Sequence, residues 1–162
     1  MALCVCAGVA SAEVLDRVLA VVGGQIITLS DVVAARELGL EMPAPGVDPV
    51  RAVLSRLIDR ELILDEVDRY APPEPSADAV DRELAAVRAR FASREALDAT
   101  LARCGIDENH LRETLRQNLR IRAYLDQRFS GADVRRQAAI DDWVAGLRRR
   151  ADIIDLYLAT SD

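Results

Sequence analysis

A few residues of this chain belong to types that carry out chemistry, but they lack the partners that a reaction needs. His110 is the only histidine, and no serine or cysteine is spaced to act with it as a nucleophile. Cys104 stands directly before Gly105 at an expected helix end, which favours a buried small side chain over a reactive thiol. No cysteine and histidine cluster has zinc-ligand spacing. We therefore predict no catalytic residue, no metal site and no cofactor.

Three other groups of residues have simpler interpretations than chemistry. The acidic clusters at 65–68 and 141–142 could hold a metal or act as acid–base pairs, yet neighbouring arginines and helical placement favour solvated helix faces. Gly23-Gly24 is not a phosphate-binding loop, because no lysine follows it and it joins two apolar runs. Arg148-Arg149-Arg150 is interpreted as the cationic last turn of a helix. The net charge of −6 argues against general affinity for nucleic acid.

Gly23-Gly24 is most informative as the turn of a β-hairpin. Val14–Val22 and Gln25–Leu29 flank it and are rich in β-branched residues, and a two-residue turn needs the positive φ that glycine allows. Ser30 is then predicted as the N-cap of a helix. Ile153–Leu158 has the composition of a further strand, and a hairpin alone is marginal in water. We therefore expect this strand to complete a small sheet with the hairpin.

Between these strands, apolar residues recur at helical spacing in several further segments. The strongest helix begins at Pro49 after Asp48, and it runs to about Tyr70 before the proline-rich stretch 71–75 ends it. Predicted N-caps of the next helices are Ser76, Ser93 and Asp107, and the last helix carries Ile140, Trp143, Val144 and Leu147. The expected fold is mainly α: about six helices with a small antiparallel sheet, formed by the N-terminal hairpin and the C-terminal strand.

The first twelve residues, MALCVCAGVASA, carry no charge and end in Ala10-x-Ala12, the small-residue pattern of a signal-peptide cleavage site. The usual basic segment is missing, so an upstream start or a frayed apolar terminus is the alternative. Charged residues from Glu13 onward interrupt the apolar run before it reaches the ~18–20 residues of a membrane-spanning helix. We expect export after cleavage near Ala12, no stable membrane insertion, and one periplasmic domain over residues 13–162.

Four segments, taken in order, resemble the core of the SurA-type periplasmic chaperones, which are related to the parvulin-type peptidyl-prolyl isomerases. They are similar to the family's opening hairpin, its long helix, its next helices and its closing helix and strand. The segments are LDRVLAVVGGQIITLSD, LSRLIDRELILDEVDRY, ALDATLARCGIDENHLRETLRQNLRIRAYLDQRF and IDDWVAGLRRRADIIDLYL. The resemblance covers essentially all of residues 13–158.

The chain departs from this family in one respect. Family members usually carry one or two parvulin domains before the closing helix, but here only a short stretch separates Phe129 from Ile140. An independent domain needs at least ~50 residues, so none fits there. The active-site histidine of parvulins and a Gly-Gly-Asp-Leu-like signature are also missing. The resemblance therefore implies the chaperone core without isomerase activity, and we predict that the protein is not an enzyme.

The resemblance implies an ATP-independent periplasmic chaperone that binds unfolded outer-membrane or secreted polypeptides. An apolar groove between helices, with available backbone edges, would hold such clients weakly. Leu40, Met42 and Phe91 are the predicted client contacts, with ordinary packing as the alternative. Two other functions stay open: a peptidyl-prolyl isomerase, as family membership implies, and an accessory subunit of a separate isomerase. The terminal strand could also be exchanged between two copies, which would give a homodimer.

Overall fold

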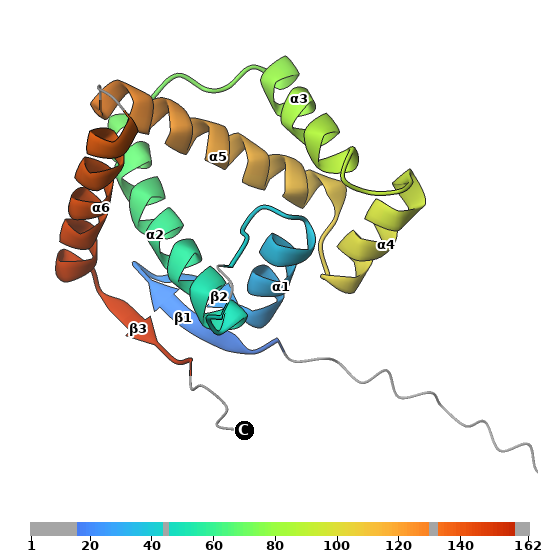
Figure 1. Cartoon of the computed structure of the whole chain (residues 1–162), viewed down its shortest axis with the longest axis horizontal. Helices are drawn as coiled ribbons and strands as arrows, with labels where there is room; N and C mark the ends of the chain where they lie inside the picture. The colour runs from blue at the N-terminus through green and yellow to red at the C-terminus, as the bar shows by residue number, and fades with distance from the viewer. Residues whose placement is uncertain (1–15, 44–45, 130–132, 158–162) are drawn as a thin grey trace, which may run out of the picture.

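A β-hairpin opens the part of the chain that the structure, a computed structural model, describes: residues 16–43, 46–129 and 133–157 (Figure 1). Strand β1 (Val18–Val22) pairs antiparallel with β2 (Gln25–Thr28). Gly23 and Gly24 form the turn between them with φ of +57° and +88°, where a Cβ would be strained. The predicted hairpin is confirmed, although residues 14–15 of its first strand lie outside the described ranges.

Helix α1 (Leu29–Glu37) follows β2 directly, and it begins earlier than predicted. Thr28 is its N-cap, and the prediction of Ser30 was wrong. The Thr28 hydroxyl accepts a hydrogen bond from the Asp31 amide, and the Asp31 carboxylate accepts one from the Thr28 amide at 2.8 Å. This reciprocal capping box requires an acidic or amide side chain three residues after the cap. Thr28 has such a residue in Asp31, whereas Ser30 is followed at that spacing by Val33.

Strand β3 (Ile153–Asp155) closes the sheet from the other end of the described chain. It pairs antiparallel with β1, so the strand order is β2-β1-β3. Just past the strand, the Leu156 amide donates to the Leu19 carbonyl at 2.9 Å. The predicted pairing of a C-terminal strand with the hairpin is confirmed over a shorter length, and Leu158 lies outside the described residues.

Helix α2 (Pro49–Tyr70) packs against β1 and β2 and also contacts α1, α5 and α6 (Figure 1). The Asp48 carboxylate accepts the amides of Val50 and Arg51 at 3.0 and 3.2 Å, so the predicted start is confirmed. The helix ends where Ala71 takes a left-handed φ of 42°. Proline at position 72 disfavours a helical conformation for the residue before it, which accounts for the stop there.

Four more helices complete the fold, and their predicted caps are confirmed. They are α3 (Ala77–Arg88), α4 (Arg94–Arg103), α5 (Glu108–Arg128) and α6 (Asp133–Arg150). The side chains of Ser76, Ser93 and Asp107 each accept the backbone amide three residues further on. Helix α5 packs against both α2 and α3, and α6 lies beside α2 (Figure 1).

The buried apolar side chains of the described residues form two clusters. The central cluster lies between the sheet, α2, α6 and the second half of α5, and it includes Leu19, Val22, Val53, Leu54, Ile58, Val67, Tyr124 and Leu147. The lateral cluster joins α1, α3, α4 and the first half of α5, and it includes Leu38, Val80, Leu84, Val87, Leu97, Cys104, Leu111 and Leu115. Because α1 and α5 contribute to both clusters, these two helices connect them.

Across the described ranges, no helix combines the length and the apolar character that crossing a membrane requires.

Candidate functional site

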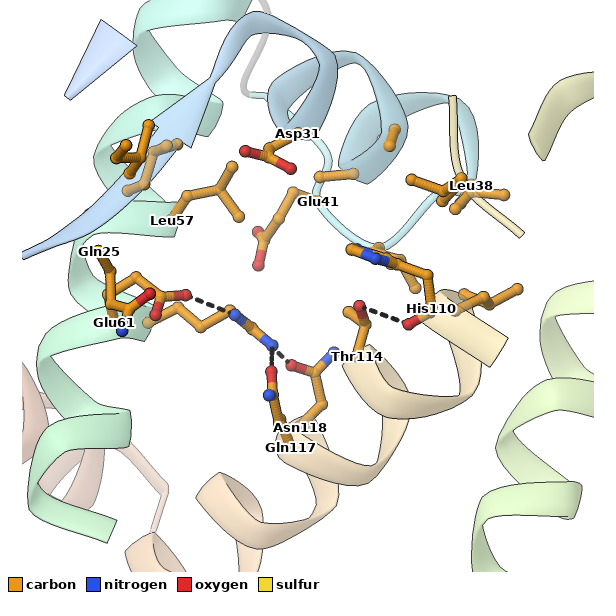
Figure 2. A pocket seen from close by; sticks show the side chains of 18 residues that line it. Gln25, Asp31, Leu38, Glu41, Leu57, Glu61, His110, Thr114, Gln117 and Asn118 are labelled. Carbon is orange, nitrogen blue, oxygen red and sulfur yellow. Dashed lines mark hydrogen bonds and ion pairs between the residues drawn. The ribbon is translucent and has the colours of Figure 1, made fainter. Parts of the chain in front are cut away.

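A cavity of about 230 Å³ lies where the two clusters meet. It is bounded by β2, α1, α2 and the first half of α5 (Figure 2). Two of its apolar side chains, Ile27 and Ala35, belong to the central cluster. Three others, Ala34, Leu38 and Leu111, belong to the lateral cluster. The cavity therefore occupies the seam between the two packed units, where neither one fills the space completely.

The three side chains predicted as client contacts lie in different places. Leu40 is half-buried and lines the cavity. Met42 stands in the same loop with 68% of its surface exposed, and its carbonyl accepts a hydrogen bond from Arg56 at 2.8 Å. Phe91 follows α3 and packs against the lateral cluster, away from the cavity lining. Of the three, only Leu40 lines the cavity, and Leu40 and Phe91 both pack against the lateral cluster.

A polar network centred on Arg60 forms another side of the cavity. The guanidinium donates to Glu61 Oε1 at 2.6 Å, to Gln117 Oε1 at 2.5 Å and to Asn118 Oδ1 at 3.1 Å (Figure 2). These bonds use all three guanidinium nitrogens. Since Arg60 and Glu61 belong to α2 and the two amides belong to α5, the network ties the two helices together beside the cavity.

Three carboxylates from three segments line the cavity: Asp31 of α1, Glu41 of the following loop and Glu61 of α2. Burial raises the pKa of Glu61, and the adjacent Arg60 guanidinium opposes that shift. The negative charges of Asp65 and Asp31 raise the pKa of Glu61 further. Burial is therefore the main reason that the pKa of Glu61 is raised.

His110 lies in the first turn of α5, as predicted, with its side chain on the α5 side of the cavity (Figure 2). Its carbonyl accepts a hydrogen bond from the Thr114 hydroxyl at 3.1 Å. The described lining residues include no serine or cysteine that this imidazole could activate. Cys104 is buried in the lateral cluster, as predicted, and burial raises the pKa of its thiol, which disfavours the reactive thiolate.

Metal binding finds no support in the described part of the chain. No group of three or more histidine, cysteine, aspartate or glutamate side chains there is arranged to hold a metal ion. The cavity carboxylates are distributed over α1, the loop after it and α2, which suits contacts with a ligand larger than an ion.

Four aromatic side chains lie together near the C-terminal end of α2. Tyr70, Tyr124, Phe129 and Trp143 lie with neighbouring ring centroids 5.5 to 6.0 Å apart. The Arg128 guanidinium carbon lies 5.1 Å from the Trp143 ring centroid and covers this cluster. Tyr124 and Trp143 also contact the central cluster, as predicted for Trp143. This aromatic group serves packing, and it is separate from the cavity.

Sequence reasoning named one residue of the cavity lining, Leu40, and missed the polar network. Arg60, Glu61, Gln117 and Asn118 belong to no motif, and each is an ordinary polar residue of a helix. One signal was available: adjacent uncharged amides stand in the middle of α5, a helix rich in arginine. Such amides are well suited to satisfy a partly buried charged group.

No protein-family model matches the chain, and no curated protein is significantly similar to it. The resemblance to the SurA-type chaperones therefore stays a prediction from sequence motifs. Function has to be inferred from the chemistry of the cavity and from its position at the seam.

Proposed function

We propose that this protein is an ATP-independent periplasmic chaperone that binds unfolded polypeptide segments at the seam between its two clusters. The observation that carries this proposal is a cavity with an apolar wall and a polar network beside an edge strand. Within the described residues, β2 pairs with a strand on one side only, and Gln25, Ile26 and Ile27 of β2 line the cavity. Unfolded chains expose apolar side chains and unpaired backbone groups, and this site offers a surface for both.

The size of the cavity favours a side chain of a polymer over a free small molecule. Sites for drug-sized ligands and cofactors typically measure about 300–1,000 Å³. A dry apolar cavity of about 150 Å³ accepts benzene. The present volume of about 230 Å³ therefore suits one aliphatic or aromatic side chain, with the remainder of the ligand lying outside along the rim.

Binding of one side chain gives the weak affinity that a holding chaperone requires. Full burial of a leucine or phenylalanine side chain contributes about 1.5–3 kcal/mol. Ordering the bound segment offsets part of this gain. Clients would therefore leave readily without ATP hydrolysis. Outer-membrane or secreted chains are the expected clients, because the uncharged segment 1–12 is expected to direct export.

The direct test is suppression of aggregation of an unfolded outer-membrane protein on dilution from urea. Leu40→Gln places an amide in the cavity wall, so we expect weaker suppression than by the wild-type protein. Val134→Gln is the matched control, because Val134 is 84% exposed on α6, outside the cavity lining. The proposal fails if the wild-type protein, at several-fold molar excess, leaves aggregation unchanged.

A proline-peptide isomerisation assay separates this function from the isomerase alternative. We expect rates equal to the uncatalysed background, because the resemblance covers the chaperone core and includes no parvulin domain. A rate that rises in proportion to the protein concentration would favour the enzyme. A single stoichiometric partner captured from periplasmic extract would favour the accessory subunit.

A further inference from the structure

We propose that the segments bound at this cavity are cationic: an apolar side chain enters the cavity while a nearby lysine or arginine contacts its carboxylates. This inference rests on the proposed chaperone function and specifies its substrate class. It is carried by the combination of an apolar wall with an unbalanced set of acidic side chains.

The charge balance of the lining is the first step. Its three carboxylates, Asp31, Glu41 and Glu61, meet two guanidinium groups: Arg60 in the lining pairs with Glu61, and Arg56 outside it pairs with Glu41. One negative charge is therefore left in excess. The Arg60 guanidinium is already engaged by Glu61 and two amides, so it is poorly placed to receive an anionic client. An acidic segment would be repelled here, and a basic one attracted.

The position of the carboxylates relative to the apolar wall is the second step. Figure 2 shows Asp31 and Glu41 directed toward the middle of the cavity, between the α2 side chain of Leu57 and the α5 side. The Asp31 carboxylate caps α1 through one oxygen, Oδ2, which accepts both bonds recorded from Thr28. A cation beside a bound apolar side chain would therefore meet carboxylate oxygens without displacing the helix cap.

Arg56 provides an internal example of the same recognition. Its Nη1 atom donates to Glu41 Oε2 at 3.2 Å and to the Met42 carbonyl at 2.8 Å. A guanidinium is thus already held here by the carboxylate of Glu41 and the backbone carbonyl of Met42. Both partners of this pair are partly exposed, so a client arginine can compete for Glu41 at little cost.

The edge strand indicates the spacing between the two client side chains. A segment paired with β2 would be extended, so residues separated by one position would point to the same face. We therefore expect the cation two positions from the apolar residue. A cation immediately next to the apolar residue would point away from the carboxylates.

Fluorescently labelled peptides test this substrate class directly. The series keeps one leucine and places arginine, glutamine or glutamate two positions away, with a fourth peptide in which arginine is adjacent. We expect fluorescence anisotropy to show about two- to fivefold tighter binding of the first arginine peptide than of the glutamine peptide, with glutamate weakest. Raising the salt concentration to 0.5 M should reduce this preference, because the contacts are partly exposed.

Glu41→Gln should remove most of the preference for the arginine peptide over the glutamine peptide. Asp98→Asn is the matched control, because it removes an exposed carboxylate of α4 that is outside the cavity lining. Circular dichroism confirms that both variants fold. Equal affinities for the arginine, glutamine and glutamate peptides would overturn the substrate class and leave the proposed function standing. If none of the peptides binds, both proposals fail.

Discussion

The central and lateral clusters are similar in composition but differ in how the chain assembles them. The central cluster joins β1 near the start of the described chain to β3 and α6 near its end. Arg148 of α6 adds bonds to Asp59 and to the Ser55 carbonyl of α2. The lateral cluster is made largely of successive helices, α3, α4 and the start of α5, joined by α1. One cluster is therefore held by distant segments of sequence and the other by neighbouring ones.

This difference indicates that the lateral cluster can open without the central one. Its polar links to α1 are few: Arg90 donates to the carbonyls of Leu38 and Gly39 at 3.2 and 2.7 Å, and Arg103 of α4 pairs with Glu37 at 3.8 Å. Units with few long-range contacts open locally at a lower free energy than the whole fold. Because the cavity lies at the seam, such opening would widen it for clients larger than a single side chain.

Leu54→Ala should have the largest effect, because Leu54 is 0% exposed at the middle of the central cluster. We expect the free energy of unfolding to fall by about 2–5 kcal/mol. Urea unfolding followed by Trp143 fluorescence and by circular dichroism should remain coincident, since loss of this cluster is global. Two separate transitions in this variant would contradict the prediction that loss of the central cluster unfolds the whole protein.

Leu84→Ala is the matched change in the lateral cluster, where Leu84 is 1% exposed. We expect a local loss of about 2–4 kcal/mol that opens α3 and α4 before the remainder of the fold. Trp143, the only tryptophan, reports on the central cluster, so helical signal should be lost before its fluorescence changes. Coincident transitions would show that the two clusters unfold as one unit.

Arg90→Ala tests the link between the lateral cluster and α1, and it should lower stability less than the two core substitutions. It removes the hydrogen bonds to Leu38 and Gly39 and so weakens the link between α3 and α1. We expect a loss of about 1 kcal/mol, seen as faster amide hydrogen exchange in α3 and α4 with unchanged exchange in β1. Arg94→Ala, at the start of α4, is the control and should leave both regions unchanged.

The smallest expected effect is a dependence of stability on pH, through the contacts that hold β3 and Tyr157 in place. A hydrogen bond from the Tyr157 hydroxyl, at 2.6 Å, holds the pKa of Asp48 below its ordinary value. For Asp155, burial is the largest single influence and raises the pKa. The hydrogen bonds from Arg51 and from the Tyr157 amide, together with the charges of Arg51 and Arg148, outweigh it, so the pKa is lowered overall. Lowered values mean that both groups stabilise the fold above the ordinary pKa of about 4, and that this is lost as pH falls through the lowered values.

Tyr157→Phe tests this link. At pH 7 the variant should melt at a lower temperature than the wild-type protein, because Asp48 loses its donor. The difference should shrink as the pH falls through the lowered pKa of Asp48, because the carboxylate then becomes protonated in both proteins. Thermal melts at a series of pH values measure it, and a difference that grows on acidification would contradict the assignment.

Rules that act over a few neighbouring residues were sufficient to predict most helix and strand boundaries, but they could not predict the cavity. Asp48, Ser76, Ser93 and Asp107 cap helices as predicted, because each acts on amides within three residues. Ser30 was wrongly predicted because Thr28, two residues earlier, is the actual cap. Asp31 favours Thr28 because it completes the capping box with that residue. The bonds from Arg60 to Gln117 and Asn118 join residues far apart in sequence, so only the packing of α2 against α5 reveals them.

The pairing of β1 with β3 has a consequence for the timing of folding. The two strands are separated by most of the chain, so β1 cannot pair with β3 until the region around residue 153 has been synthesised. At about 5–20 residues per second, that interval is roughly 7 to 26 seconds. During this time the hairpin has an unpaired edge of its own. The nascent protein thus passes through a state with the same exposed backbone groups that it is proposed to recognise in others.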